Sequence, residues 1–311
     1  MVNFYEAVAA NKRKSWVVII GFMLFVVLAS VMIAKGLGAY YGYQSTGLEF
    51  TGLALIISGV MSFISYYFSD SVILSLSQAR PADRRQDFLF YTVAENLSIA
   101  AGLPMPKLYV IDDTAMNAFA TGRDPQHAVV VATKGLLAKL NRTELEGVIG
   151  HELSHVANYD TRLMSIVTVL VGLITLLGDW LLRASWYGGG RKRSNDDGNT
   201  GALMIALGFL FAILSPIVAQ LIQLAISRRR EFLADANSVK LTRQPSGLIS
   251  ALKKLGADKE PLEVANKATA HLYIVNPLQN LSSSHAVGWF ANLFNTHPPL
   301  PERIKVLEQM A

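Results

Sequence analysis

Long apolar runs without a charged residue alternate with polar segments along this chain. The first run, residues 16–34, is uncharged throughout, and a helix of this length spans a hydrocarbon layer of roughly 30 Å. The second run, residues 52–68, ends in aromatic residues of the kind found at membrane interfaces. We therefore predict two transmembrane helices within residues 1–68. No small-x-small site follows the first run, which disfavours the alternative of a cleaved signal peptide.

A second pair of apolar runs covers residues 163–182 and 202–226, and an aspartate and a proline interrupt them. Basic residues lie both in the loop between these runs, at 191–193, and after the second run, at 228–230. Because lysine and arginine mark the cytoplasmic ends of spans, the two basic clusters conflict. The sequence predicts a second membrane hairpin in residues 161–226 and leaves open whether it crosses fully.

The composition supports a membrane protein and limits the side chains that could bind a metal. Only 16% of the residues are charged, whereas an ordinary soluble domain carries about 25%. This composition excludes a disordered chain and a coiled coil. The chain has no cysteine, so a metal site must use histidine and carboxylate side chains. Three basic residues, 12–14, precede the first apolar run, which places the N terminus in the cytoplasm.

Two polar segments remain for soluble structure, residues 69–160 and 227–311. In the first, helical spacing predicts a helix over residues 87–101 that ends at Gly102. The same segment contains short β-branched runs that predict strands, with a turn at 122–125 before the last of them: residues 108–111, 117–121 and 129–131. In the second polar segment, helical patterns are separated by a long loop: residues 247–255 and 302–310.

Residues 151–155 read His-Glu-Leu-Ser-His, an H-E-x-x-H motif within a segment of helical spacing. Thr143 and Glu146, three residues apart, predict a capping box at the start of this helix. At about 100° per residue, His151 and His155 lie on one face, so both imidazoles can reach one Zn²⁺. Glu152 projects beside them, where it can activate a zinc-bound water. The alternative is an ordinary helix with two surface histidines.

A catalytic zinc site needs a third protein ligand, and Glu231 is the candidate. Glu231 and Asp235 are four residues apart, hence on one helical face. Glu231 could bind zinc while Asp235 accepts a hydrogen bond from a ligand histidine and fixes its tautomer. The alternative is an exposed helix with ordinary charged pairs.

The chain resembles the HtpX family of membrane-integrated zinc metalloproteases, which is related to the CaaX-processing prenyl endopeptidases. The resemblance rests on the paired apolar hairpins and on three motifs in the family's order: H-E-L-S-H at 151–155, R-R-R-E-F-L-A-D at 228–235 and T-H-P-P-L-P-E-R at 296–303. It implies a mainly α membrane protein with about four membrane helices. A cytoplasmic zincin-like catalytic domain would combine the H-E-x-x-H helix with a small β-sheet.

The resemblance also implies a role for each motif residue. One zinc ion per chain would be held by His151, His155 and Glu231. Glu152 would be the general base and acid, and Asp235 would support the ligands.

The resemblance also suggests residues that contact the substrate. Segment 116–122 resembles the family's strand beside the active site, which places three residues near the substrate backbone: Asn117, Ala118 and Phe119. A substrate peptide would add to the edge of this strand. His297 and Arg303 resemble a pair that contacts substrate or stabilises the oxyanion, although His297 could equally be a surface residue before a Pro-Pro turn. The remaining histidines carry no motif and are assigned to surface loops: His127, His271 and His285.

The predicted function is zinc-dependent hydrolysis of peptide bonds in unfolded or misfolded membrane proteins, a form of protein quality control. The protein would be a multi-pass protein of the bacterial inner membrane, with its N terminus and active site in the cytoplasm. Its partners would be unfolded polypeptides and the lipid bilayer, and not nucleic acid, because the basic run at 191–193 is too small. The alternatives are a CaaX-type prenyl-protein peptidase and a non-enzymatic zinc-binding scaffold. The sequence leaves the oligomeric state open.

Overall fold

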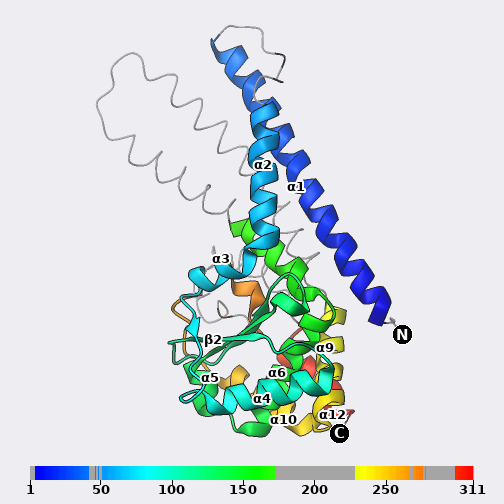
Figure 1. Ribbon diagram of the computed structural model, residues 1–311, viewed down its shortest axis with the longest axis vertical. Helices are drawn as coiled ribbons and strands as arrows, with labels where there is room; N and C mark the ends of the chain where they lie inside the picture. The colour runs from blue at the N-terminus through cyan, green and yellow to red at the C-terminus, as the bar shows by residue number, and fades with distance from the viewer. Residues whose placement is uncertain are drawn as a thin grey trace, which may run out of the picture.

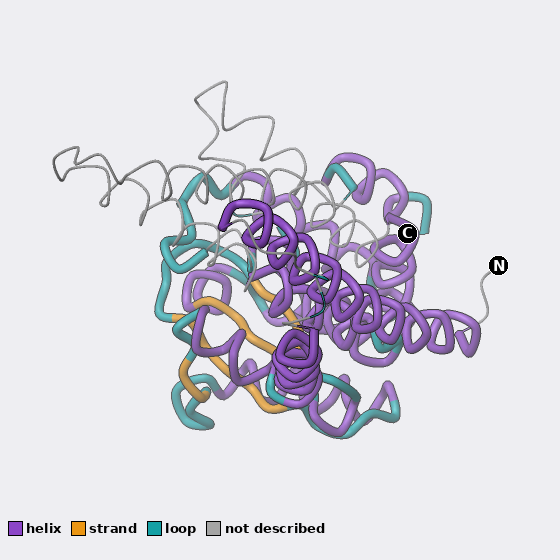
Figure 2. The backbone as a smooth tube through the Cα atoms, turned by 90° about the horizontal axis from the view of Figure 1, so that it is seen from above, coloured by secondary structure: helices purple, strands orange, loops and turns teal. Residues whose placement is uncertain are grey.

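The structure is a computed structural model that describes residues 4–41, 46, 48, 51–172, 228–265, 269–275, 277 and 298–310. Two long helices, α1 (Phe4–Tyr41) and α2 (Thr51–Tyr67), project from a body that holds the β-sheet and most other helices (Figure 1). The N-terminal end of α1 comes down beside this body (Figures 1 and 2).

The projecting helices contain the first two apolar runs of the sequence. Helix α1 includes residues 16–34, and α2 ends where α3 (Ser69–Leu76) begins at an angle of 78°. In the part of the chain that the structure describes, no single helix meets a length and hydropathy criterion for a membrane span, whereas α2 and α3 meet it together as a bent pair. Of the predicted second hairpin, residues 161–172 are helical and the rest lies outside the described residues.

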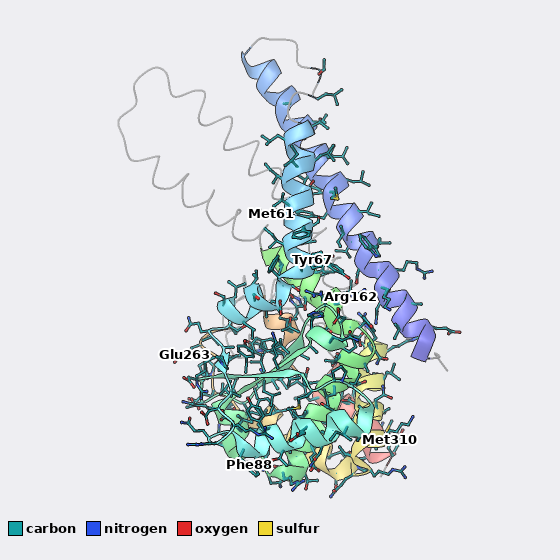
Figure 3. All side chains as sticks on the ribbon, in the orientation of Figure 1. Met61, Tyr67, Phe88, Arg162, Glu263 and Met310 are labelled. Carbon is teal, nitrogen blue, oxygen red and sulfur yellow. The ribbon has the colours of Figure 1, made fainter. Side chains whose placement is uncertain are left out.

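Basic side chains lie over aromatic rings where the projecting helices meet the body (Figure 3). The guanidinium of Arg162 is 5.4 Å from the ring centroid of Tyr66, and that of Arg123 is 5.2 Å from the ring of Tyr67. Trp16 of α1 stacks on Tyr66 of α2 at 6.3 Å. These contacts hold α1 and α2 against the body.

A mixed four-stranded sheet has the order β1-β2-β4-β3. Strand β1 (Arg80–Pro81) is antiparallel to β2 (Lys107–Ile111), β2 is parallel to β4 (Val129–Thr133), and β4 is antiparallel to the edge strand β3 (Ala118–Thr121). The three predicted strands are confirmed, and the predicted turn at 122–125 leads into a 3-10 helix, η1 (Pro125–His127).

The sheet is buried on both faces, which explains the continuous apolar run of β4. Val130 and Ala132 belong to a core cluster with α4 (Phe88–Ala101) and α6 (Arg142–Ala157), whereas Val129 and Val131 belong to a second cluster with α3. Both faces of a strand must then be apolar, because successive side chains point to opposite faces. The predicted helix before the sheet is confirmed as α4, and it ends at Gly102 with a left-handed φ of 65°.

The second polar segment packs onto α6 and forms one body with the first. In its described part it supplies three α-helices, and the last two confirm predicted helical patterns: α9 (Arg228–Thr242), α10 (Pro245–Ala257) and α12 (Leu300–Glu308). Short helices α5 (Lys134–Lys139) and η2 (Ala270–Leu272) complete the described elements. Helix α6 lies among these helices and beside β3, so residues on its faces contact both halves of the body.

The capping box of α6 differs from the predicted one. Asn141, not Thr143, caps the helix: its side chain accepts from the Glu144 N–H, and the Glu144 carboxylate accepts from the Asn141 N–H. The predicted box of Thr143 and Glu146 was wrong. Asn141 and Glu144 have the same spacing as Thr143 and Glu146, so the spacing alone could not identify the cap. Leu140 is buried, and both Leu140 and Asn141 have an extended backbone, so the first helical turn begins at Arg142.

Among the histidines without a motif, one prediction was wrong. His271 is fully buried in η2, where its Nε2 lies 2.9 Å from the hydroxyl of Thr168. His127 is exposed at the surface, as predicted. His285 lies outside the described residues. The burial of His271 comes from the packing of η2 against the helix that contains Thr168, a contact between segments 103 residues apart.

Candidate metal centre

Three side chains from two helices converge on one point in the body. His151 and His155 come from α6 and Glu231 comes from the first turn of α9. The Nε2 atoms of the histidines are 3.2 Å apart. The Glu231 oxygens lie 3.6 Å from Nε2 of His151 and 3.5 Å from Nε2 of His155. The structure thus brings together the three residues that the sequence suggested as metal ligands.

The spacing of these atoms fits a single zinc ion. A tetrahedral zinc ion, with Zn–N distances of about 2.0–2.1 Å, places neighbouring ligand atoms about 3.3 Å apart. The three measured distances lie close to that value, and two imidazoles with a carboxylate form a typical zinc ligand set. In the described part of the chain the group has three members, the number typical of catalytic zinc sites, whereas structural sites have four protein ligands.

Small residues allow α6 and α9 to approach closely enough to form this group. A Cβ at Gly150 of α6 would lie 2.9 Å from the hydroxyl of Ser238 on α9. That hydroxyl donates to the carbonyl of Gly147, one turn earlier on α6, at 2.6 Å. The helix-to-helix hydrogen bond and the missing side chains hold the backbones together. Glu231 is thereby placed opposite the histidines.

An aspartate and an arginine stand behind His151. Asp235, one turn after Glu231, has an oxygen 2.8 Å from Nδ1 of His151. Arg303 of α12 donates to both carboxylate oxygens of Asp235, at 2.6 and 2.8 Å. Burial raises the pKa of Asp235, but the Arg303 charge and the hydrogen bonds outweigh it and lower the pKa to about 2. The charged Asp235 therefore holds the Nδ1 proton of His151 and leaves Nε2 to face the cluster.

The corresponding support of His155 was missed from the sequence. An oxygen of Asp160, three residues after the end of α6, lies 3.0 Å from Nδ1 of His155. Arg230 of α9 lies 3.3 Å from the other oxygen of Asp160. The only sequence signal was an aspartate five residues after the second histidine, which is too common to single out. Each ligand histidine is therefore backed by an aspartate, and each aspartate by an arginine.

The buried carboxylates make the cluster favourable for a cation. Burial alone lowers the pKa of His155, but the hydrogen bond to Asp160 and the charges of Glu231 and Glu152 outweigh it and raise the pKa to about 9. Glu152 itself is buried on α6, directly after His151. A group of negative charges around two imidazoles is the environment in which a divalent cation replaces a proton.

Arg303, which the sequence suggested as a contact for substrate or oxyanion, lies against the metal cluster. Its side chain is fully buried and bound to Asp235, with one guanidinium nitrogen 3.3 Å from Nδ1 of His151. Another guanidinium nitrogen of Arg303 lies 3.7 Å from an oxygen of the candidate ligand Glu231, so Arg303 contacts the cluster itself as well as Asp235. His297, its suggested partner, lies outside the described residues.

The three residues suggested as substrate contacts touch the chain's own backbone or core. The amide of Asn117 donates to the carbonyl of Val275 at 2.8 Å, and the carbonyl of Ala118 accepts from the N–H of Ile274 at 3.0 Å. Phe119 packs edge-on against Tyr273, with ring centroids 5.0 Å apart. The outer edge of β3 at Ala118 is thus occupied by residues 273–275 of the same chain.

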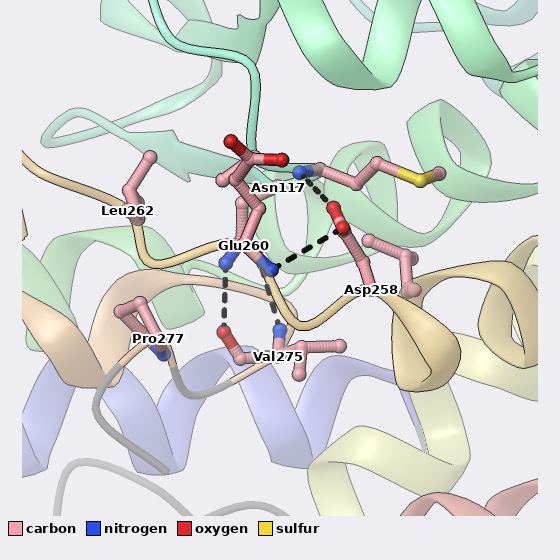
Figure 4. A pocket seen from close by; sticks show the side chains of 9 residues that line it. Asn117, Asp258, Glu260, Leu262, Val275 and Pro277 are labelled. Atoms are coloured by element: carbon pink, nitrogen blue, oxygen red, sulfur yellow. Dashed lines mark hydrogen bonds between the residues drawn. The ribbon is translucent and has the colours of Figure 1, made fainter. Parts of the chain in front are cut away.

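A small pocket lies beside this contact (Figure 4). Asn117 and Val275 line one side of it, and Asp258 lines another. The Asp258 carboxylate accepts from the N–H of Met116 at 2.7 Å, so the acidic residue fixes the chain just before β3. The pocket contains none of the three candidate metal ligands.

Comparison with known proteins identifies the family. Residues 85–311 match the model of peptidase family M48. The chain is 47% identical to the Protease HtpX homolog of Dictyoglomus turgidum, over 99% of this chain and 95% of that protein. It is 41% identical to the Protease HtpX homolog of Ligilactobacillus salivarius, over 98% of this chain and 99% of that protein. A crystal structure of S. mikatae Ste24p aligns with 97% of this chain and 67% of its own, at 18% identity and a TM-score of 0.44. The chain therefore belongs to peptidase family M48, among the HtpX proteases, and is a metalloprotease.

Proposed function

We propose that this protein is a zinc-dependent endopeptidase of the bacterial inner membrane. It hydrolyses peptide bonds of unfolded or misfolded membrane proteins on the cytoplasmic side. The observation that carries the proposal is the convergence of His151, His155 and Glu231 at distances that fit one zinc ion. When bound, zinc polarises the scissile carbonyl and lowers the pKa of water to about 7.

Residues of the chain would transfer the protons and hold the ligand histidines in place. The carboxylate of Glu152, beside the ligands, takes a proton from the attacking water and returns it to the leaving amine. Asp235 and Asp160 hold the Nδ1 protons of the two histidines, which keeps both Nε2 atoms available as ligands. The burial of Glu152 on α6, directly after the ligand His151, supports its assignment as general base and acid.

The contacts of α1 support an active site on the cytoplasmic side. Lys12 lies 4.3 Å over the ring of Tyr159, and Asn11 donates to Asp160 at 2.7 Å. The basic start of α1 is therefore on the same side as the metal centre. If α1 crosses the membrane, the positive-inside rule assigns that side to the cytoplasm. The aromatic and basic residues at the junction with α2 fit a membrane–water boundary there.

The burial of the ligands supports unfolded polypeptides as substrates. Of the three ligands, His155 is the most exposed, at 5%. The surface of a folded protein is too broad to approach side chains buried to this extent, and a single extended segment needs the smallest opening. We propose that the substrate enters as an extended chain and that its backbone pairs with the protein's own backbone, which requires few specific side chains.

The test compares the full-length wild type with Glu152→Gln in detergent, using a fluorescently labelled unfolded protein and measuring zinc content. We expect both proteins to hold about one zinc per chain and only the wild type to cleave. Glu146→Gln is the matched control, because Glu146 lies on the same helix and pairs with the surface residue Arg142. Unchanged cleavage by Glu152→Gln would contradict the proposal. Cleavage of a prenylated CaaX peptide, with no cleavage of the unfolded protein, would favour the prenyl-peptidase alternative.

A further inference from the structure

The two ligand histidines have parallel supports with one difference. At His151, the supporting aspartate is Asp235, which pairs with the guanidinium of Arg303. Behind His155, Asp160 contacts both Arg230 and a residue of the N-terminal helix α1. That residue, Asn11, is 149 residues away in sequence and is 2% exposed.

Asn11 uses its whole amide group in this contact. Its Nδ2 donates to Oδ1 of Asp160 at 2.7 Å and to the backbone carbonyl of Asn158 at 2.9 Å. Its Oδ1 accepts from Arg230 at 2.8 Å. An amide has two N–H donors and a carbonyl acceptor, so asparagine satisfies all three partners at once. Neither aspartate nor an apolar residue of similar size can do so.

These bonds fix the orientation of Asp160. Asn11 and Arg230 engage Oδ1, which leaves Oδ2 directed at Nδ1 of His155. The hydrogen bond to Asn158 also fixes the backbone at the end of α6, immediately before Asp160. The orientation of a ligand histidine is set by the partner of its second nitrogen, so the position of Asp160 controls His155.

We propose that Asn11 is a positioning residue of the metal centre, which holds His155 in its ligand orientation through Asp160. The inference rests on the proposed zinc site and goes beyond the proposed function. Under this proposal, α1 is a membrane helix whose first turns also support the metal centre. Displacing the start of α1 from the body would then loosen one of the three ligands.

The test measures zinc affinity of the full chain in detergent by competition with a chromophoric chelator. Asp160→Ala removes the contact with His155 directly, and we expect about 10–100-fold weaker zinc binding. Asn11→Ala acts one step further away, and we expect a smaller loss, several-fold. Because both changes break one chain of contacts, the double variant should bind zinc no more weakly than Asp160→Ala alone. Arg13→Ala, at an exposed position on the same helix, is the control and should bind as the wild type does.

A purely structural role for Asn11 gives a different result. In that case Asn11→Ala lowers the unfolding temperature of the metal-free protein and leaves zinc affinity unchanged, which would overturn the inference. Asn11→Asp keeps the side-chain size and the packing of α1 but cannot donate to Asp160. It should also weaken zinc binding, and wild-type affinity in this variant would likewise overturn the inference. A wild type that binds zinc without cleaving any substrate would overturn only the proposed reaction.

Discussion

The carboxylate of Asp235 lies 2.8 Å from Nδ1 of His151, and both residues are almost fully buried. Asp235 is one helical turn from the candidate ligand Glu231, so the same helix supplies a ligand and the partner of another ligand. Arg303 neutralises Asp235 from behind. Asp235 therefore lies between a candidate metal ligand, His151, and the cation Arg303.

Removing Arg303 should destabilise the protein strongly. Arg303→Met leaves the buried carboxylate of Asp235 without its cation, and breaking a buried ion pair in this way costs about 3–5 kcal/mol. The measurement is the free energy of unfolding from urea denaturation. Arg142→Met is the control, because its ion pair with Glu146 is at the surface and such pairs contribute at most about 1 kcal/mol. Equal effects of the two substitutions would contradict the buried role of Arg303.

Removing the metal should lower the unfolding temperature. A ligand that binds only the folded state stabilises it by about 4 kcal/mol at a thousand times its dissociation constant. We expect a chelator to lower the unfolding temperature of the wild type and added zinc to restore it. Glu231→Gln, which weakens the carboxylate ligand, should show a much smaller response to zinc. A wild type with no response to chelator or zinc would contradict the metal site.

Substitution of Gly147 should disturb the packing around α6. A Cβ at this position would lie 2.8 Å from the Cα of Leu248 on α10, and a backbone atom cannot move aside easily. We expect Gly147→Ala to destabilise the protein by about 1–3 kcal/mol, the usual cost of overpacking. Gly59→Ala is the control, because nothing lies within 4 Å of the added methyl and alanine favours a helix. Urea denaturation of both variants provides the measurement.

The stability of the capping box should depend on pH through Glu144. Burial raises the pKa of Glu144, but hydrogen bonds from Lys254, Ser250 and the Asn141 N–H outweigh it and hold the pKa below its ordinary value of 4.5. A carboxyl group with a lowered pKa stabilises the fold above its unfolded pKa, and this contribution is lost as the pH falls through the folded pKa.

Unfolding of the wild type and of Glu144→Gln, measured between pH 7 and pH 3, tests this dependence. The variant should be less stable at pH 7, by about 0.5–2 kcal/mol for a lost cap. The difference between the two proteins should shrink as the pH falls. A constant difference over this range would contradict the assignment.

Local patterns in the sequence were sufficient for elements whose residues depend on their immediate neighbours. The β-branched run at residues 129–131 predicted β4, and the spacing around His151 and His155 predicted a helix that carries both on one face. The spacing of Glu231 and Asp235 gave their shared helical face in the same way. These predictions succeeded because a helix or strand fixes the directions of its own side chains.

The capping box shows where local patterns stop being sufficient. Asn141 with Glu144 and Thr143 with Glu146 have the same spacing, so the sequence could not choose between them. In the structure the buried Leu140 and the next residue, Asn141, are extended, so the helix begins after Asn141 and Asn141 becomes its cap.

The sequence by itself determined that this protein has apolar runs suited to a membrane, an H-E-x-x-H helix and a cysteine-free ligand set. The spacing also suggested Asp235 as a partner of a ligand histidine, whereas only the tertiary structure decided that Asp160 supports His155 and that Arg303 pairs with Asp235. Asn11 and Asp160 meet across 149 residues, and Arg303 reaches Asp235 across 68. Such contacts depend on how separate helices pack together, and no spacing within one helix encodes that packing.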